Sequence, residues 1–324
     1  MRVLGAELVV RLLDMPSCIR AVERAFRERG AGRPAPSAIS GLELRDGSLH
    51  AKMASLELSR PYVAAKVNAN FPRNPVEHDL PTIQGVLVLF DGANGVPLAV
   101  MDSGPLTTLR TAAASAVAAS LLARPDASTA TFIGCGVQAR AHLEAIHLVR
   151  PLRRIFPIDA RPAIAEEFSV LARTSLGVDV TVASSLAAAA RESDVIVTTT
   201  PSRSPLLDVD DVSPGTFIAA VGADNEHKQE IAPALLRAAA VVVDDLEQCA
   251  RFGDLHHAIA CGAMRCEDVR ASLDQIVAGT RQGRLDDAEV VIFDSTGLAI
   301  EDVAAAALVY ERATATDVDT TLNS

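Results

Sequence analysis

The sequence has no tryptophan and few other aromatic residues, with two tyrosines and nine phenylalanines among 324 residues. Its net charge of -11 opposes binding to a polyphosphate, and so few rings leave little to stack against bases. We therefore expect no nucleic-acid partner. No stretch reaches the ~20 apolar residues of a membrane span, and residues 1–30 show acids and arginines at helical spacing instead of a signal peptide. The sequence predicts no membrane association and a cytoplasmic location.

Cysteine is scarce, and its spacing does not indicate a metal site. The five cysteines are Cys18, Cys135, Cys249, Cys261 and Cys266. Their odd number and the lack of a CxxC pair favour reduced thiols over structural zinc. The adjacent His256 and His257 have no acid or cysteine at ligand spacing. We interpret both histidines as structural and expect no metal.

Length and patterning predict two domains, because one hydrophobic core usually stops growing at ~250–300 residues. Residues 7–29 have helical periodicity, and residues 42–100 form short alternating apolar runs typical of an antiparallel meander. Within the meander, Asn94-Gly95 lies between two apolar runs and predicts a tight hairpin. We expect an α+β substrate-binding and dimerisation domain in residues 1–115, joined by the C-terminal segment 295–324.

Residues 116–294 are predicted to form the second domain. A helix rich in small side chains, with Thr107 or Thr108 as its N-cap, leads into it and ends before Pro125. From Ser128 onward, continuous Val/Ile/Ala runs alternate with helical segments, which is typical of a parallel sheet covered on both faces. The predicted fold class is α/β, with a doubly wound, Rossmann-type parallel sheet.

A glycine-rich turn follows the first predicted strand of this second domain. Residues 134–139 read GCGVQA and match the pattern G-x-G-x-x-G/A between a strand and a helix. Gly134 permits the tight turn, and Gly136 lets the backbone approach a pyrophosphate. The amides of the helix start, at Val137 and Gln138, favour the same anion together with the helix dipole. The alternative is an ordinary strand-to-helix turn; the surrounding alternation of strands favours dinucleotide binding.

Asp159 ends the next predicted strand, close to the ~20-residue offset at which an acid binds the adenosine ribose. An acid there disfavours a 2′-phosphate, so the sequence favours NAD over NADP. Arg161 could offset that repulsion, which keeps NADP possible. The alternative interpretation of Asp159 is a helix N-cap.

Further segments, in order along nearly the whole chain, resemble the ornithine cyclodeaminase/μ-crystallin family. They are Lys66 with Asn68, LPTIQG (80–85), PLA (97–99), LTTLRTAA (106–113), the Gly134 turn, VGAD (221–224) and FDSTGLA (293–299). Members include cyclodeaminases, an archaeal type of alanine dehydrogenase, and ketimine, pyrroline-carboxylate and other imino-acid reductases. The resemblance implies an NAD(P)-dependent enzyme that moves a hydride to or from the α-carbon of a small amino or imino acid. It also implies a homodimer formed through the first domain.

The resemblance implies roles for three charged residues. Lys66 matches the active-site lysine, Arg110 the arginine that binds the substrate carboxylate, and Asp224 the acid beside the nicotinamide. A guanidinium pairs bidentately with a carboxylate, Lys66 can bind that carboxylate or relay a proton, and Asp224 can hold the substrate nitrogen or activate water. Without the resemblance, a strand lysine is more often solvent-facing, and charges at element ends are more often caps. The residues implied to lie near the cofactor are Thr82, Arg110, Thr111, Gln138, Val221, Asp224, Lys228 and Ser295.

One departure from the family bears on the substrate. Members often carry an arginine just before the first meander strand, where this chain reads PSAIS (36–40). We hypothesise that Lys52 supplies the missing positive charge and contacts substrate; the alternative is a surface lysine. The departure favours an amino-acid dehydrogenase or imine reductase over an ornithine- or lysine-type cyclodeaminase that releases ammonia. A crystallin-like protein that binds NAD(P)H and a small molecule, or a regulatory NAD sensor, is the alternative outside enzymes.

Overall fold

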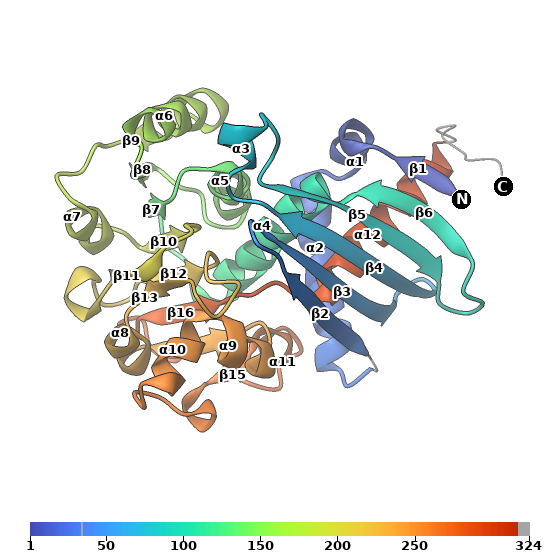
Figure 1. The fold of residues 1–324 in the computed structure, drawn as a ribbon. Helices are drawn as coiled ribbons and strands as arrows, with labels where there is room; N and C mark the ends of the chain where they lie inside the picture. Colours follow the sequence, from blue (N-terminus) through green and yellow to red (C-terminus); the bar gives the residue numbers. More distant parts are fainter. Residues whose placement is uncertain (34, 317–324) are drawn as a thin grey trace. The chain divides into compact units, whose positions relative to one another are not determined.

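The computed structural model describes residues 1–33 and 35–316. By contact clustering it consists of two compact units (Figure 1). Unit 1 comprises Met1–Thr111 and the chain from Leu298 onward, and unit 2 comprises Ala112–Gly297. Residues 317–324, which the sequence analysis assigns to the first domain, lie outside the described residues. No helix in the described part of the chain is long and apolar enough to cross a membrane.

Unit 1 is built on a six-stranded sheet with the order β1-β6-β5-β4-β3-β2. Its strands are β1 (Arg2–Leu4), β2 (Ser37–Glu43), β3 (Ser48–Glu57), β4 (Pro61–Asn70), β5 (Ile83–Asp91) and β6 (Pro97–Asp102). Its helices are α1 (Ala6–Leu12), α2 (Met15–Gly30), the short α3 (Asn74–Glu77) and α12 (Ala299–Ala315). Strands β2 to β6 are antiparallel neighbours, so the predicted meander is confirmed. The analysis missed β1, which pairs parallel with β6 and is too short to show periodicity.

The two faces of this sheet differ because side chains alternate along each strand. On β4, Tyr62, Ala64 and Lys66 are buried on the face that we call the inner face, against which α12 packs. Val67 and its outer-face neighbours remain partly or largely exposed. The inner face therefore holds the core of unit 1, and Lys66 lies within it.

The predicted hairpin joins β5 to β6, but its turn differs from the predicted tight turn. Gly95 has φ +75°, whereas the described non-glycine residues include only Asp79 at positive φ. The Gly95 amide donates to the Asp91 carbonyl, and the Asn94 side chain accepts from the Val96 amide. The side chain of Asn94 therefore closes a longer loop in which one glycine takes the left-handed conformation.

The boundary between the units falls within α4 (Ser103–Leu122). The predicted N-cap at Thr107 or Thr108 is wrong, because this helix begins four residues earlier, at Ser103. The Asp102 side chain accepts a hydrogen bond from the Gly104 amide. Pro105 is tolerated in the first turn, because backbone amides there have no acceptor within the helix and proline has no amide hydrogen. The helix ends before Pro125, as predicted.

Unit 2 contains an eight-stranded, fully parallel sheet with the order β15-β14-β16-β12-β10-β7-β8-β9. Its strands are β7 (Thr129–Ile133), β8 (Arg154–Ile158), β9 (Asp179–Val180), β10 (Val195–Thr198), β12 (Phe217–Ala220), β14 (Ala240–Val243), β15 (Ala271–Ser272) and β16 (Val291–Asp294). Its longer helices are α5 (Val137–Val149) and α6 (Pro162–Leu176), and its shorter ones α7 (Leu186–Arg191), α8 (Pro233–Ala238), α9 (Leu246–Phe252), α10 (Asp254–Ala260) and α11 (Leu273–Val277). Strands β11 (Arg203–Leu207) and β13 (Gln229–Ile231) form a separate pair.

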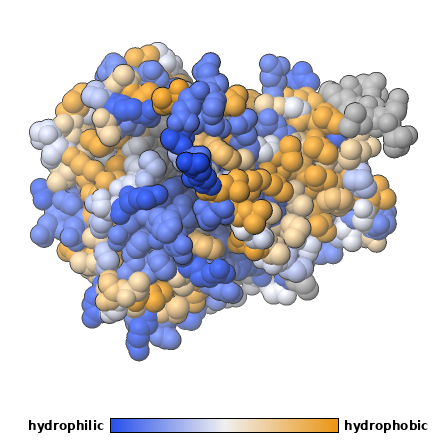
Figure 2. Space-filling model, in the orientation of Figure 1, coloured by the Kyte–Doolittle hydropathy of each residue, from blue (hydrophilic) through white to orange (hydrophobic). Residues whose placement is uncertain are grey.

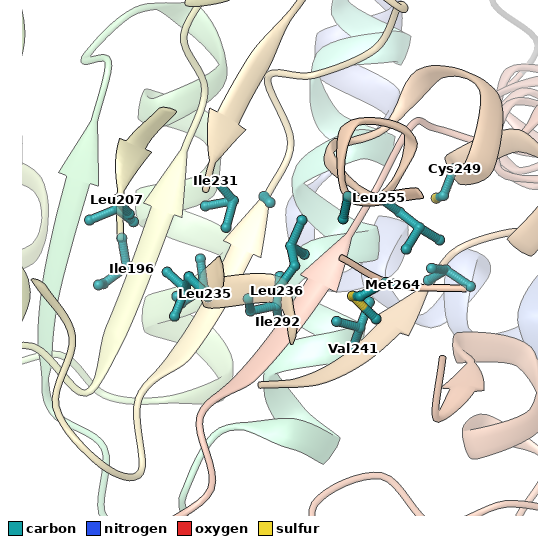
Figure 3. Packing of buried hydrophobic residues seen from close by; sticks show 14 of the residues in the cluster. Ile196, Leu207, Ile231, Leu235, Leu236, Val241, Cys249, Leu255, Met264 and Ile292 are labelled. Carbon is teal, nitrogen blue, oxygen red and sulfur yellow. The ribbon is translucent and has the colours of Figure 1, made fainter. Parts of the chain in front are cut away.

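The central strands of unit 2 are buried on both faces. Ile196, Val241 and Ile292 extend from β10, β14 and β16 into one apolar cluster that also holds Leu235 and Leu255 (Figure 3). Continuous Val/Ile runs were the feature that predicted this sheet, and the doubly wound fold class is confirmed. The carboxyl ends of these strands carry most of the predicted cofactor residues, as expected for ligand sites of such sheets.

Candidate active site

The glycine turn lies between β7 and α5 in unit 2. Gly134 has φ +83°, and a Cβ atom there would lie 2.9 Å from the Thr200 methyl carbon and 3.0 Å from the Thr199 carbonyl oxygen. Only glycine fits that position without strain. Gly136 is the N-cap residue of α5, no side chain caps this helix, and a Cβ on Gly136 would meet nothing within 4 Å. Open space therefore borders an uncapped helix N-terminus, the arrangement that suits a pyrophosphate.

Asp159 lies beside this turn. Its Oδ2 atom accepts the Cys135 amide at 2.9 Å, and its Oδ1 atom accepts the Arg161 amide at 2.8 Å. The N-cap residue of α6 is Arg161, and no side chain caps that helix, so the interpretation of Asp159 as a helix N-cap is wrong. In the adjacent helix start, the buried Gln138 Oε1 has no hydrogen-bond partner among the described residues. A buried acceptor without a donor is costly, and a bound dinucleotide could supply the donor.

Asp224 follows β12 in unit 2 and is about half exposed. Its Oδ1 atom accepts a hydrogen bond from Lys228 Nζ at 2.7 Å and one from the Asn225 amide group at 3.2 Å. The structure therefore brings together two residues that the family resemblance assigned separately to the cofactor. Lys228 balances the charge of Asp224 in this arrangement.

Glu230 was missed by the sequence analysis, although it fixes the loop that carries Asp224. Its buried carboxylate accepts from Thr198 Oγ1 at 2.6 Å, the Thr200 amide at 2.6 Å and the Gly222 amide at 2.8 Å. A Cβ on Gly222 would lie 2.5 Å from this carboxylate, so glycine is required there. Glu230 thus ties together the loops after β10 and β12. The signal available in the sequence was its place six residues after Asp224, which alone does not indicate burial.

Val221 and Ser295 follow neighbouring strands of the sheet, since the Ser295 amide donates to Ala220 at the end of β12, and the Val221 amide donates to Thr198. The Ser295 hydroxyl donates to the buried Asp244 carboxylate at 3.3 Å, and the amides of Thr296 and Gly297 donate to the same carboxylate at 2.7 Å. Asp244 therefore shapes the turn that bears Ser295.

Lys66 lies on the inner face of unit 1, where its residue is only 3% exposed, so the interpretation as a solvent-facing lysine is wrong. Its Nζ atom lies 2.7 Å from each carboxylate oxygen of Asp302 and 3.3 Å from Thr107 Oγ1. The pKa of Lys66 is lowered to about 7: burial is the largest cause, the charges of Arg110 and Lys52 also lower it, and Asp302 offsets part of this fall. A lysine with such a pKa can exchange a proton near neutrality.

Arg110 projects from α4 into the same buried cluster. Its Nη1 atom lies 2.7 Å from Glu301 Oε2, and its Nε atom lies 2.9 Å from Asp302 Oδ1. Burial would raise the pKa of Asp302, but the charges of Arg110 and Lys66 outweigh it and hold that pKa below its usual value. The structure thus brings Lys66 and Arg110 together around one carboxylate.

The two acids of this cluster, Glu301 and Asp302, were missed. They lie at the start of α12, directly after the recognised FDSTGLA segment. Two adjacent acids that begin an alanine-rich helix are the one available signal, but first-turn acids are ordinary partners of the helix dipole. Their partners on β4 and α4 lie 236 and 191 residues away along the chain, and only the fold reveals them.

Lys52 is directly opposite Lys66 in the β3–β4 ladder, and Ile39 is opposite Lys52 in the β2–β3 ladder. Opposite residues share a face of the sheet, so Lys52 lies on the inner face beside Lys66. Thr111 and Thr82 show local contacts: the Thr111 hydroxyl donates to the Thr107 carbonyl, and the Thr82 carbonyl accepts the Phe71 amide. Their contact with a cofactor stays a prediction.

The two histidines that the analysis set aside are held by backbone carbonyls. His256 Nδ1 contacts the Ala250 carbonyl, and His257 Nε2 contacts the Lys228 carbonyl at 2.8 Å. Within residues 1–33 and 35–316, no group of three or more His, Cys, Asp or Glu side chains could hold a metal ion.

Comparison with known proteins identifies the family of this chain. A family model described as ornithine cyclodeaminase/mu-crystallin family matches residues 2–317. The chain is 40% identical over 316 residues to an alanine dehydrogenase of Archaeoglobus fulgidus, covering 98% of this chain and 96% of that protein. A solved archaeal alanine dehydrogenase dimer with bound NAD superposes with a TM-score of 0.95 and 40% identity, over 100% of this chain and 99% of that one.

A second solved structure is as similar in shape. The Thermococcus litoralis Δ1-pyrroline-2-carboxylate reductase, in complex with NADH and L-proline, has a TM-score of 0.95 and 32% identity, over 99% of this chain and 100% of that one. The family model, the Archaeoglobus fulgidus relative and both of these solved structures match over nearly the full length. The chain belongs to the ornithine cyclodeaminase/mu-crystallin family.

Proposed function

We propose that this chain is an NAD(H)-dependent oxidoreductase that interconverts a small L-amino acid and its imino or keto acid. The observation that carries the proposal is the buried Lys66–Arg110 pair on the inner face of unit 1, since two cations buried side by side suit a carboxylate ligand. The bound NAD, NADH and L-proline of the similar structures support the same chemistry. We also propose a cytoplasmic location.

Unit 2 supplies the cofactor half of this proposal. NAD, when bound, gives or takes the hydride. Gly134, Gly136 and the amides at Val137 and Gln138 hold its pyrophosphate, and Asp159 accepts hydrogen bonds from its adenosine ribose. Asp159 favours NAD over NADP. The largely exposed guanidinium of Arg161, 3.8 Å from Asp159, could still pair with the 2′-phosphate of NADP.

Unit 1 supplies the substrate half. Arg110 orients the carboxylate, and Lys66 binds the same group or moves a proton at its Nζ atom. Asp224 holds the substrate nitrogen or activates water. Lys52 adds positive charge beside Lys66 in place of the arginine that many family members carry.

The decisive experiment is a substrate screen with purified protein. NADH oxidation should follow addition of pyruvate, glyoxylate or oxaloacetate with ammonium, or of a cyclic imino acid such as Δ1-pyrroline-2-carboxylate. Ammonia release from ornithine or lysine without net change in NADH would instead indicate a cyclodeaminase. Binding of NADH without any turnover across the panel would indicate a binding or sensor protein and overturn the proposal.

Variants separate cofactor binding from chemistry. Lys66→Ala and Asp224→Asn should lose most turnover and keep NADH affinity within several-fold. Gly136→Ala should instead weaken NADH binding, because its methyl group meets nothing in the protein but enters the space proposed for the pyrophosphate. It should keep its thermal stability and lose NADH affinity by about tenfold or more. Unchanged affinity in Gly136→Ala would place the cofactor elsewhere.

We further propose a homodimer formed through the outer face of the unit 1 sheet. This face carries apolar side chains that stay exposed on β2, β3, β4 and β5, including Met53 at 47% and Val86 at 49%. Figure 2 shows hydrophobic residues gathered over β4, β5 and β6. An exposed apolar face of this kind marks an interaction surface. A similar solved structure is itself an alanine dehydrogenase dimer.

Light scattering tests the dimer. Met53→Glu combined with Val86→Lys should convert the protein to monomer, because both introduce charge into the proposed interface. Val182→Lys is the matched control, since Val182 is 83% exposed in unit 2. A dimeric double variant would place the interface elsewhere.

A further inference from the structure

Asp302 contacts both buried cations of unit 1, Lys66 and Arg110. It contacts Lys66 Nζ with both carboxylate oxygens at 2.7 Å and Arg110 Nε with one of them at 2.9 Å. Its neighbour Glu301 has a different set of contacts, with Arg110 Nη1 at 2.7 Å and the Leu298 amide at 3.1 Å. Asp302 therefore contacts both buried cations, and Glu301 pairs with Arg110.

The charge of Lys52 has the opposite effect to that of Asp302 on the ammonium group of Lys66. It lies directly opposite Lys66 in the β3–β4 ladder, where Cβ atoms are about 4.5–5.5 Å apart. Its charge lowers the pKa of both Lys66 and Asp302. The ammonium of Lys66 is thus stabilised by Asp302 from α12 and destabilised by Lys52 from β3 and Arg110 from α4, while Thr107 of α4 accepts a hydrogen bond from it.

The distribution of lysine in the chain supports a special role for these positions. Only three of the 30 basic residues are lysines, namely Lys52, Lys66 and Lys228, and the others are arginines. Lys66 and Lys228 each form an ion pair with an aspartate, Asp302 and Asp224 respectively. An arginine stays protonated in proteins, whereas a lysine changes its protonation state when its surroundings change. Lysine therefore occurs only where the proposed chemistry is placed.

We propose that Asp302 is a positioning residue that holds Lys66 Nζ beside Thr107 and, opposed by Lys52, sets the pH at which Lys66 exchanges its proton. The inference rests on the proposed function, in which Lys66 contacts the substrate. Its consequence is that Lys66 alternates between ammonium and neutral amine near neutrality, the range in which a proton relay is most effective. The lowered pKa of Lys66, about 7, agrees with this geometry.

The test uses the full-length protein with lysine carbons labelled at Cε and followed by NMR during a pH titration. Three lysines give three resonances, and Lys52→Met and Lys228→Met assign them. Lys66 should titrate near pH 7 in the parent protein. Asp302→Asn should lower that midpoint by about 1 pH unit or more, because it removes the opposite charge, whereas Lys52→Met should raise it by roughly half a unit.

Glu301→Gln is the matched control, because it changes the adjacent buried acid, which pairs with Arg110 at 2.7 Å. It should move the Lys66 midpoint by less than half the shift of Asp302→Asn. A Lys66 midpoint above pH 9, an unshifted midpoint in Asp302→Asn, or an equal shift in Glu301→Gln would each overturn the inference. If Asp302→Asn does not fold, Asp302→Glu takes its place, because it displaces the same charge by one methylene group and should still move the Lys66 midpoint; an unshifted midpoint in Asp302→Glu would then overturn the inference.

The NMR titration needs no turnover, so it separates this inference from the proposed function. The pH profile of kcat/KM for NADH-dependent reduction gives the linked readout. Its Lys66 limb should move in the same directions as the NMR midpoints in Asp302→Asn and Lys52→Met. Shifted midpoints in a protein with no activity would sustain the role of Asp302 and overturn the proposed reaction.

Discussion

The two units bury charge in different ways. Unit 1 pairs opposite side chains, so that Lys66 and Arg110 each lie within 2.9 Å of a carboxylate oxygen of Asp302. Unit 2 buries carboxylates that are satisfied mainly by backbone amides: Asp294 accepts from Asp254 and Leu255 at the start of α10, and Asp254 accepts from Glu230 and Ile231. Charge is thus balanced by charge in one unit and by peptide dipoles in the other.

This difference has consequences for proton binding. Amides stabilise a carboxylate without cancelling its charge, and Asp254, Asp294 and Glu230 repel one another within unit 2. Burial raises the pKa of Asp254 well above its usual value and raises that of Asp294 to about 7. In unit 1 the cations instead hold the pKa of Asp302 below its usual value. Asp254 and Asp294 of unit 2 therefore keep their protons to higher pH than Asp302 of unit 1 does.

The largest expected effect comes from removing a cation from unit 1. Arg110→Met leaves the Glu301 carboxylate buried without its guanidinium partner, and breaking a buried pair in this way costs about 3–5 kcal/mol. Urea denaturation should show that loss in the free energy of unfolding. The double variant Arg110→Met/Glu301→Leu should recover most of it, because no charge is then left unbalanced. A loss below 1 kcal/mol in the single variant would contradict charge pairing in unit 1.

A smaller effect is expected from removing an acid from unit 2. Glu230→Ala leaves the amides of Thr200 and Gly222 and the Thr198 hydroxyl without their acceptor, at about 1–3 kcal/mol for each donor that stays buried and unpaired. Relief of repulsion with Asp254 offsets part of this cost, so we expect a net loss of about 2–4 kcal/mol in urea denaturation. NADH affinity should also fall, because the loop that carries Asp224 loses its anchor.

The control for Glu230→Ala is Glu247→Ala, at an exposed position of α9, which should stay within about 0.5 kcal/mol of the parent. Glu230→Gln should lie between the two, because its amide oxygen still accepts while its NH2 group opposes one donor. A Glu230→Ala protein as stable as the control would mean that amides do not depend on this carboxylate.

Local sequence patterns were sufficient to predict the strands and turns whose conformation depends on residues close to them in the chain. The Val/Ile/Ala runs of β10 and β12 predicted a sheet that is buried on both faces. The segment GCGVQA at 134–139 predicted a strand-to-helix turn, and only glycine fits at position 134 of that turn. The same patterns failed where tertiary contacts decide. Strand β16 is the last of its sheet in the sequence, yet it inserts between β12 and β14, and no local signal sets that order.

The candidate site shows the same division. Lys66, Arg110 and Asp224 were identified through a family resemblance carried by short motifs. Asp302 and Glu301, which pair with Lys66 and Arg110, and Glu230, which fixes the loop of Asp224, were not identified, because an acid's burial depends on which elements pack against it. Asp302 faces a strand 236 residues earlier in the chain, so its role becomes visible only when β4 and α12 are in contact.

The expected effect that is smallest over any one pH unit is a pH dependence of stability, with opposite slopes from the two units. Asp294 has a folded pKa of about 7, raised by burial from 3.8, so the native state binds more protons than the unfolded state between those values. Its contribution to the free energy of unfolding should therefore fall as pH rises from about 4 to about 7, by at most about 1.4 kcal/mol per pH unit. Lys66, with its pKa lowered from 10.5 to about 7, gives a rise between about pH 7 and pH 10.

Urea denaturation from pH 5 to pH 10 measures both slopes. Asp294→Asn should flatten the fall below pH 7 and leave the rise above it, and Lys66→Met should do the opposite. The exposed Asp179→Asn is the control and should alter neither slope. If Asp294→Asn left the acid-side slope intact, the excess protons of the native state would have to reside on another group of unit 2, and Asp254, whose pKa burial raises well above its usual value, would be the next residue to replace.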